Sequence, residues 1–331
     1  MQKRNMIYII SGAIGMTVLI LDGKTAVSGI REGIQICIHT LISALFPFLF
    51  LSGMLTDSLS SINPRLFKPL GKLCRIPDSS ISLLPVGWLG GYPMGARCAS
   101  RLVVTGQASP QNATQFAIIC NSAGPAFLFG ILGSFFSRKS AVFMLWLIHL
   151  ISAILTGILL TGNPQQHIKE AYTPSRSFTD ILNDSLRAMG SICGCVLLFR
   201  MILEFLNRWF LWLLPDTLQV LAAGCLELTN GCLQLSRISS ESVRFILTSV
   251  MLSFGGVCIW LQTLSVFPDI QLSRYMRGKL LQTYFSLILS GAFVFLSEEN
   301  PYQVAVCIGL AIIPFLLRRH GLSPAKKEVA I

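Results

Sequence analysis

The stretch Gly87–Arg97 places turn-forming residues next to a cation. The Gly90-Gly91 pair lets the backbone turn sharply, and Pro93 suits the start of a helix because its missing N–H would be unpaired there anyway. The N–H groups of a helix start attract an anion, and Arg97, one turn further on, adds a full charge. The alternative is a packing kink whose Arg97 reaches the cytoplasmic interface. We expect an anion-binding turn made of Gly91, Tyr92, Pro93, Gly95 and Arg97.

A second polar group interrupts the next apolar run. Pro125 has no N–H to donate to the carbonyl of Asn121, so this carbonyl has no partner within its own helix. Ser122 adds a hydroxyl at the same level. Free carbonyls and polar side chains at mid-membrane can coordinate ions or polar substrates, although a neighbouring helix could also satisfy them in a purely structural kink. The binding residues expected here are Asn121, Ser122, Gly124 and Pro125.

Glu227 is an ionisable residue inside an apolar stretch of the second half of the chain. Such a position is costly in a membrane and usually implies a role. Glu227 could bind a cation, hold a proton for coupling, or form a structural ion pair with Arg200 in the preceding helix. We assign the second half of the site to Glu227, Thr229, Asn230, Gly231 and Ser253.

The sequence carries no motif of an enzyme or a metal centre. Its ten Cys form no CxxC pair, its four His form no HExxH spacing, and it has no GxSxG, P-loop or dinucleotide fingerprint. Most of the Cys lie in apolar runs, where Cys behaves as a small hydrophobic residue. We therefore expect no enzyme, no metal and no cofactor, while a coupling ion, Na⁺ or H⁺, is left open.

The composition places these groups in a membrane. Hydrophobic residues make up 53% of the 331 residues and charged residues only 12%, about half the charged share of a soluble domain. Apolar runs of about 20 residues, long enough to cross a bilayer as a helix, recur along the chain. We predict an all-α polytopic membrane protein with eight spanning helices: Met6–Leu21, Gly33–Leu55, Ala113–Phe136, Ala141–Thr161, Ala188–Phe210, Val243–Phe267, Leu280–Leu296 and Val304–Leu317.

Two further apolar stretches, Ile81–Val104 and Thr217–Leu235, contain helix breakers near their middle. The breakers are Gly90–Pro93 in the first stretch and Thr229–Gly231 in the second. Irregular backbone at membrane depth is tolerated only where protein covers it or where it lines a cavity. We predict that both stretches are re-entrant hairpins, each made of two half-helices and a turn.

The distribution of basic residues sets the expected orientation. If the N-terminus is cytoplasmic and each hairpin returns to the side it entered from, 18 of the 26 Lys and Arg lie on the cytoplasmic side, Lys279 among them, and 7 lie outside. This excess predicts that both termini are cytoplasmic. It also accounts for the net charge of +11 without a nucleic-acid partner.

The two halves of the chain share one pattern. In each, a spanning helix is followed by a broken hairpin and then by a span with a weak spot near its centre. Aligning Ser122 with Ser253 also aligns Ser109 with Ser240. Three crossings separate the corresponding helices, so the halves are inverted, as in many secondary transporters. The predicted units are an N-terminal helix (1–30), a first repeat (31–162), a cytoplasmic linker (163–187), a second repeat (188–318) and a cytoplasmic tail (319–331).

Three motifs, in this order, resemble those of the YlbJ-type sporulation integral membrane proteins: Gly90-Gly91-Tyr92-Pro93-Met94-Gly95-Ala96-Arg97, Cys120-Asn121-Ser122-Ala123-Gly124-Pro125 and Leu226-Glu227-Leu228-Thr229-Asn230-Gly231. The resemblance spans about residues 30 to 320. It implies two nucleoside-recognition (Gate) domains and a more distant similarity to concentrative nucleoside transporters. It also implies a role in endospore formation, in the movement of dipicolinate across the outer forespore membrane.

These observations favour a membrane transporter of a small organic anion, with dipicolinate as the first candidate substrate. The alternatives are a nucleoside or nucleobase transporter and a membrane scaffold for spore-envelope assembly that transports nothing. A scaffold would have no need of two broken hairpins at mid-membrane. The expected location is the cell membrane or the outer forespore membrane of a spore-forming bacterium. The expected partners are the lipid bilayer and the solute, and a homo-oligomer is left open.

Overall fold

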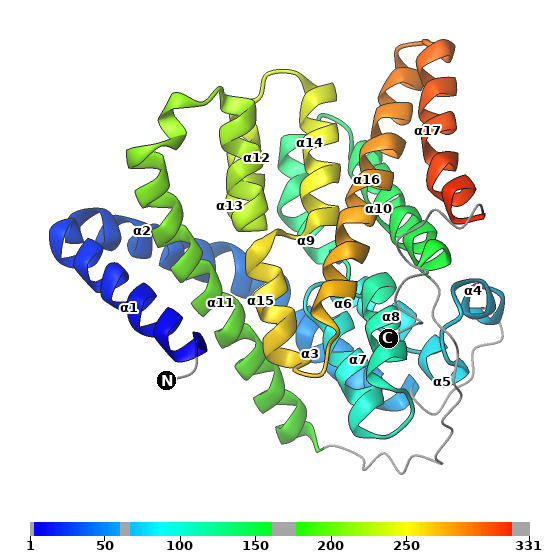
Figure 1. The fold of residues 1–331 in the computed structure, drawn as a ribbon, viewed down its shortest axis with the longest axis horizontal. Coiled ribbons are helices and arrows are strands. Elements are labelled where there is room, and N and C mark those ends of the chain that lie inside the picture. The colour runs from blue at the N-terminus through cyan, green and yellow to red at the C-terminus, as the bar shows by residue number, and fades with distance from the viewer. Residues whose placement is uncertain (1–2, 60–66, 161–176, 320–331) are drawn as a thin grey trace.

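The structure is a computed structural model that describes residues 3–59, 67–160 and 177–319. Within these residues every regular element is a helix, as the composition predicts (Figure 1). In chain order the elements are α1 (Lys3–Leu21), α2 (Gly23–Ile36), the π-helical η1 (Cys37–Ile42), α3 (Ser43–Leu59), α4 (Lys68–Cys74), α5 (Asp78–Ile81), α6 (Leu84–Gly90), α7 (Met94–Val104), α8 (Pro110–Cys120), α9 (Pro125–Gly130), the 3₁₀ turn η3 (Leu132–Phe135), α10 (Lys139–Leu159), α11 (Phe178–Trp209), the 3₁₀ turn η4 (Leu211–Leu213), α12 (Asp216–Leu226), α13 (Leu228–Leu233), the 3₁₀ turn η5 (Gln234–Arg237), α14 (Glu241–Phe254), α15 (Gly256–Val266), α16 (Leu272–Ser297) and α17 (Pro301–Arg319).

Six helical segments in the described part are long and apolar enough to cross a membrane, against the eight expected. The two differences have clear causes. The apolar part of α1, Ile9–Leu21, is short for a span, and the predicted span Ala113–Phe136 is split into α8 and α9. The six candidate spans are Gly23–Thr56, Lys139–Leu159, Phe178–Trp209, Glu241–Val266, Leu272–Ser297 and Pro301–Arg318.

Two helices start earlier than the sequence pattern indicates, because polar caps extend them. Asp22 accepts hydrogen bonds from the backbone and the hydroxyl of Thr25, so α2 begins at Gly23 and runs through the expected boundary at residue 30. Ser177 and Asp180 form a reciprocal capping box at the start of α11. Residues 178–187, expected in a cytoplasmic linker, are therefore the first turns of α11. The rest of that linker, 163–176, and the tail beyond residue 319 lie outside the described residues.

In the first predicted hairpin the helix breaks at the expected residues. Helix α6 ends at Gly90, and Gly91 follows with φ of 76°, a left-handed conformation that favours glycine. Pro93 is the residue immediately before α7 rather than its first residue. The sequence Gly-Tyr-Pro thus turns the chain between two half-helices, as its residue types predict.

The second hairpin breaks at a different residue from the one predicted. The interruption lies at Glu227, between α12 and α13, and the expected breakers Thr229–Gly231 are helical. The Glu227 carboxylate accepts hydrogen bonds from the backbone N–H groups of Thr229 and Asn230, at 3.0 and 2.7 Å. These bonds satisfy two backbone N–H groups at the start of α13, and a negative charge is favourable at a helix N-terminus. Capping of α13 by the Glu227 side chain therefore outweighs the tendency of Asn230-Gly231 to form a turn.

Both spans that follow the hairpins are interrupted, as predicted. Residues 121–124 are non-helical between α8 and α9, and α14 passes into α15 at Gly255 and Gly256, with φ of 80° and 77°. Ser109 and Ser240 cap α8 and α14 in the same way, each accepting a hydrogen bond from the backbone N–H three residues further on. The aligned serines of the two halves therefore have the same structural role.

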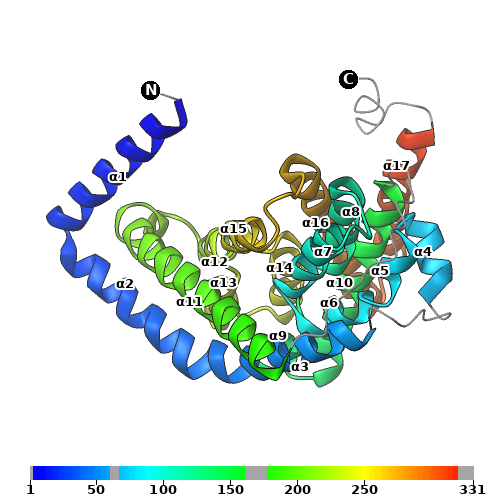
Figure 2. The same ribbon diagram turned by 90° about the horizontal axis from the view of Figure 1, so that it is seen from below.

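The two hairpins enter the helix bundle from opposite edges. In Figure 1 the α7–α8 connection lies at the lower edge, and the open end of the α12–α13 hairpin lies at the upper edge. Helix α16 packs against α10 and α14, and α11 packs along α2. Figure 2 shows α2 and α11 side by side, outside α12, α13 and α15. This arrangement brings the four interrupted segments together in the interior.

Candidate functional site

Both hairpin turns and the break at Ala123 and Gly124 border one cavity of about 40 Å³, and α15, which follows the fourth break, also lines it. The first hairpin turn contributes Tyr92, the second contributes Glu227, and α15 contributes Gln262. A water molecule needs roughly 10–15 Å³ measured this way, so the cavity has room for about three. Both hairpin turns border this cavity, and its lining is mostly apolar, with Tyr92, Glu227, Thr229 and Gln262 as the polar side chains. A polar binding site at this place stays a prediction. Besides Tyr92, Glu227 and Gln262, the lining residues from the interrupted segments are Gly90, Gly91, Ala123, Gly124, Ala126, Phe127, Leu228, Thr229 and Ile259.

Two glycines at equivalent places allow the half-helices to approach closely. A Cβ on Gly95 would lie 2.4 Å from the backbone N and Cα of Asn121. A Cβ on Gly231 would lie 2.3 Å from the Cα of Gly224. In each half the second half-helix of the hairpin is thus held against main-chain atoms, which leave no room for a side chain. Gly95 and Gly231 therefore set the position of the turns without lining the cavity.

The side chain of Asn121 connects three elements. Its Oδ1 accepts a hydrogen bond from the backbone N–H of Ala96 at 3.3 Å. Its Nδ2 donates to the Thr263 hydroxyl at 3.0 Å and to the Tyr275 hydroxyl at 2.9 Å. Both donors and the acceptor of the amide are used, and the residue is fully buried. Asn121 thus ties the first hairpin to α15 and α16 of the second half.

The main-chain carbonyl of Asn121, which Pro125 leaves without a helical partner, accepts a hydrogen bond from Nζ of Lys279 at 2.7 Å. Lys279 is fully buried, and the expectation that it lies at the cytoplasmic surface is wrong. The sequence does carry a signal for this. Lys279 begins a stripe of polar residues spaced three or four apart along α16, all of them fully buried: Lys279, Gln282, Ser286 and Ser290.

His149 of α10 is a second polar residue that the sequence analysis did not select. Its Nε2 accepts a hydrogen bond from the backbone N–H of Ala123 at 3.0 Å, and its Nδ1 lies 3.1 Å from the Ser253 hydroxyl. Gln282 donates to the His149 carbonyl at 3.2 Å. Because Nε2 accepts, the neutral ring carries its proton on Nδ1 and donates it to Ser253. His149 therefore links the aligned breaks of the two halves.

Glu227 and Arg200 do not form the ion pair that the sequence left open. Arg200 instead pairs with Glu32 of α2 and with Glu204 one turn along α11, the latter at 3.1 Å. The buried Glu227 accepts its hydrogen bonds within its own turn, including one from the Asn230 side chain at 2.8 Å. Arg200 thus fastens α11 to α2, and Glu227 stabilises the turn of the second hairpin.

The remaining predicted residues have local roles. The Tyr92 hydroxyl donates to the Leu252 carbonyl at 3.0 Å, which brings the first turn to the break of the second half. The Ser122 hydroxyl donates to the Ile119 carbonyl at 3.4 Å. Pro125 begins α9, and Gly124 precedes it against the first hairpin turn.

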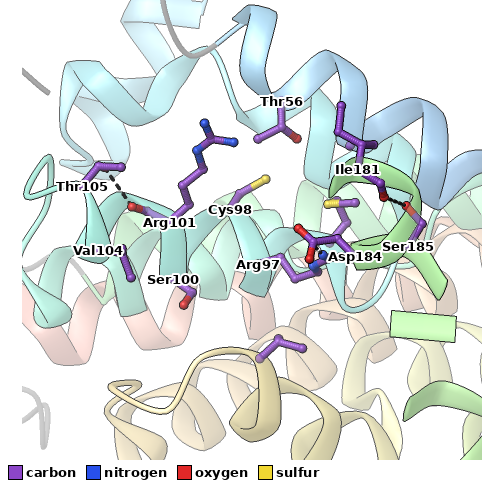
Figure 3. Close-up of a pocket in the computed structure, with 13 residues that line it drawn as sticks. Thr56, Arg97, Cys98, Ser100, Arg101, Val104, Thr105, Ile181, Asp184 and Ser185 are labelled. Carbon is purple, nitrogen blue, oxygen red and sulfur yellow. Dashed lines mark hydrogen bonds and ion pairs between the residues drawn. The ribbon is translucent and has the colours of Figure 1, made fainter. Parts of the chain in front are cut away.

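Arg97 lies apart from this cavity, in a larger and more open hollow of about 510 Å³ (Figure 3). Its guanidinium is 3.6 Å from the Asp184 carboxylate of α11. Figure 3 shows Arg101, one turn further along α7, extending toward the segment that carries Thr56. The predicted combination of Arg97 with the N–H groups after Pro93 is not assembled in this arrangement, because the Ala96 N–H is bonded to Asn121.

The hollow and the cavity lie on the two sides of the first hairpin turn. Met94, the first residue of α7, lines the hollow together with Arg97, Ser100 and Thr105, while Tyr92 lines the cavity. In the described part of the chain, no three His, Cys, Asp or Glu side chains are placed to hold a metal ion.

No family model and no solved structure matches the chain. The chain is similar to the sporulation integral membrane protein YlbJ of Bacillus subtilis (strain 168), with 23% identity over 358 aligned residues that cover 92% of this chain and 87% of that protein. The assignment of two Gate domains stays a prediction. Together, the apolar helices and this similarity over most of both chains identify this chain as an integral membrane protein that is similar to a sporulation integral membrane protein.

Proposed function

We propose that this protein is a membrane carrier for a small organic anion and acts in sporulation, with dipicolinate, moved across the outer forespore membrane, as the first candidate substrate. The observation that carries the proposal is the cavity shared by both hairpin turns. Irregular backbone at membrane depth is stable only where protein covers it or where it lines a passage. Paired broken segments from inverted halves, meeting around one site, are the architecture of secondary transporters.

The charge of the open hollow supports an anion. Among the side chains that the structure describes, its lining includes the guanidinium groups of Arg97 and Arg101 and the carboxylate of Asp184. An arginine can bind a carboxylate with two parallel hydrogen bonds, and a planar dicarboxylate such as dipicolinate offers two such groups. The volume of about 510 Å³ falls within the range of small-molecule sites, roughly 300–1,000 Å³.

The small size of the inner cavity implies movement. About 40 Å³ holds a few water molecules but no aromatic dicarboxylate, so this arrangement is closed at the centre. Transport would require the first hairpin to move away from the second half, by rocking or by an elevator-like shift. Tyr92, which bonds to the Leu252 carbonyl, is the contact that such a movement must break.

One observation favours nucleosides as the second candidate substrate. Glu227 and Gln262 both line the inner cavity, and a carboxylate next to an amide suits the hydroxyl and base edges of a nucleoside. A dianion entering the same space would meet the Glu227 carboxylate. The two candidates therefore place the substrate at different sites, the hollow or the cavity.

Flux through the purified protein in proteoliposomes tests the proposal. Radiolabelled dipicolinate and radiolabelled uridine are compared at equal concentration, with protein-free liposomes as the blank. Arg101→Ala is the test variant and Lys139→Ala, an exposed cation at the start of α10, is the matched control. We expect dipicolinate flux that Arg101→Ala weakens and Lys139→Ala does not. Flux of uridine alone would contradict the anion assignment, and flux of neither would contradict the carrier.

A further inference from the structure

Lys279 has an unusual environment for a cation. The side chain is fully buried in the middle of the protein. Its Nζ donates to the Asn121 carbonyl at 2.7 Å, to Oε1 of Gln282 at 2.9 Å and to the Tyr92 hydroxyl at 3.4 Å. These three acceptors match the three N–H donors of an ammonium group. Nζ also lies over the rings of Tyr92 and Tyr275, at 5.2 and 5.7 Å from their centroids, within the range of cation–π contacts.

No carboxylate compensates this ammonium within the residues that the structure describes. The ion pairs found there involve Arg97, Arg200 and Arg208, and none involves Lys279. A charged side chain in a membrane segment that lacks a counter-ion is rare and is usually functional. The oxygen acceptors and aromatic faces are thus all that stabilises the charge.

The titratable groups around Lys279 come from several elements and include no acid. Helix α8 contributes Cys120, α10 contributes His149 through Gln282, and Tyr92 and Tyr275 face Nζ directly. On the other two packed helices, Glu241 of α14 bonds to Ser137, and Arg318 of α17 donates to the Ile158 carbonyl. Arg244 is the second charged residue of α14, and no hydrogen bond joins it to Lys279. On α16 itself, Arg274 bonds to Gln115 and to the Leu160 carbonyl.

The partners of Lys279 belong to the parts that a carrier has to move. The Asn121 carbonyl lies at the break of the first half, and Tyr92 lies in the first hairpin turn, whereas Lys279 is on α16 of the second half. If the hairpin and the break move away, the ammonium loses two of its three acceptors. Its charged form is then destabilised, unless water takes their place.

We propose that Lys279 is a proton-binding site of this protein. The protonated side chain holds the two halves together, and it loses its proton when they separate. The inference builds on the carrier function proposed above. In the separation step an N–H bond of the ammonium breaks, the proton passes to a water molecule that enters the opened site, and the nitrogen keeps the electron pair. The proton leaves on the side where the substrate is released. A proton that binds together with the substrate on the opposite side restores the closed arrangement.

This assignment makes H⁺ the coupling ion. In transporters with broken helices, freed carbonyls coordinate Na⁺ or H⁺ sites. Here the freed carbonyl of Asn121 is already bound by the ammonium, which fills the place of a metal cation. Glu227, the alternative coupling group, uses both carboxylate oxygens to cap its own helix. Lys279 is therefore the better placed of the two.

The first test measures proton binding without any substrate. The melting temperature of the purified protein is recorded between about pH 5 and pH 9 for the wild type, Lys279→Met and the control Lys139→Met. A lysine in the unfolded chain keeps its proton across this range, with a usual pKa of about 10.4, so a divergence reports titration of Lys279 in the folded protein. We expect the Lys279→Met profile to diverge from the wild type and the Lys139→Met profile to follow it. Superposable profiles for all three would overturn the proposal.

The second test measures coupling. Proteoliposomes that contain a pH-sensitive dye receive external dipicolinate in Na⁺-free buffer. We expect internal acidification with the wild type and its loss in Lys279→Met and in Lys279→Arg, since a guanidinium does not release its proton. Lys279→Gln, which still offers a donor to the Asn121 carbonyl, replaces the Met variant if the latter does not fold. Unchanged acidification per dipicolinate in these variants would overturn the inference. Absence of wild-type dipicolinate flux would instead refute the proposed substrate, and the melting profiles alone would then decide on Lys279.

Discussion

The substitution Gly95→Ala tests the close contact between the first hairpin and the interrupted span. The new Cβ would lie 2.4 Å from both N and Cα of Asn121 and 2.5 Å from the carbonyl carbon of Cys120. These are main-chain atoms, which cannot rotate away. Overpacking costs about 1–3 kcal/mol, and the displacement would weaken the Ala96–Asn121 hydrogen bond, at about 0.5–1.5 kcal/mol. The alanine itself favours the helix by up to about 1 kcal/mol. The net expectation is a loss of about 0.5–4.5 kcal/mol.

Gly190→Ala is the matched control. Gly190 is also helical, but its added Cβ would meet no atom within 4 Å. This variant keeps the helix gain without the clash, so its stability should be unchanged or slightly higher. The assay is thermal unfolding in detergent, followed with a thiol-reactive dye that reports exposure of the buried cysteines. We expect Gly95→Ala to melt several degrees below the wild type. Equal melting temperatures for both glycine variants would refute the close approach.

Two further predictions concern the charged residues. Arg97→Lys should raise the KM for dipicolinate, because the compact ammonium of Lys lacks the planar fork of a guanidinium. Arg97→Ala removes the charge as well and should raise the KM by about tenfold, or roughly 1.4 kcal/mol. Asp184→Asn removes the carboxylate beside this guanidinium and should lower the KM. Initial rates of dipicolinate uptake give the KM of all three variants. An unchanged KM in the Arg97 variants would show that Arg97 does not bind the anion. In double-mutant cycles on stability, Arg200 and Glu32 should show coupling, whereas Arg200 and Glu227 should be additive within about 0.5 kcal/mol. Coupling of Arg200 to Glu227 would contradict the observed pairing.

Local signals in the sequence predicted the residues at which the chain breaks between α6 and α7. The turn depends on the backbone freedom of Gly91 and on the residue types around Pro93, which act over a few positions. The interruption at residues 121–124 follows from Pro125 in the same way. In the second predicted hairpin, the sequence placed the break at Thr229–Gly231, whereas it lies at Glu227. The Glu227 side chain caps α13 and so competes with the turn propensity of Asn-Gly. Residue types alone do not show which of the two effects is stronger.

The interior of the site depends on packing between distant segments, which residue types alone do not specify. Lys279 stands at the edge of an apolar run, where a cation usually lies at the membrane surface. Its burial follows from acceptors on Tyr92 and Asn121, more than 150 residues earlier in the chain. The sequence analysis did not select His149, because it considered His only as a metal ligand and found no second ligand at a suitable spacing. The partners of His149 are instead a backbone N–H and a serine hydroxyl.

The carrier function proposed here requires that the two hairpins enter the membrane from opposite faces. Cysteines are introduced one at a time at Ser79 and Gln107, near the two ends of the first hairpin, and at Thr217 and Ser239, near the two ends of the second. In membranes oriented one way, a membrane-impermeant maleimide should label the first pair from the cytoplasmic side only and the second pair from the other side only. The unsubstituted protein supplies the background of its native cysteines. Labelling of all four positions from one face would contradict the inverted arrangement, and labelling of either pair from both faces would contradict the re-entrant hairpin.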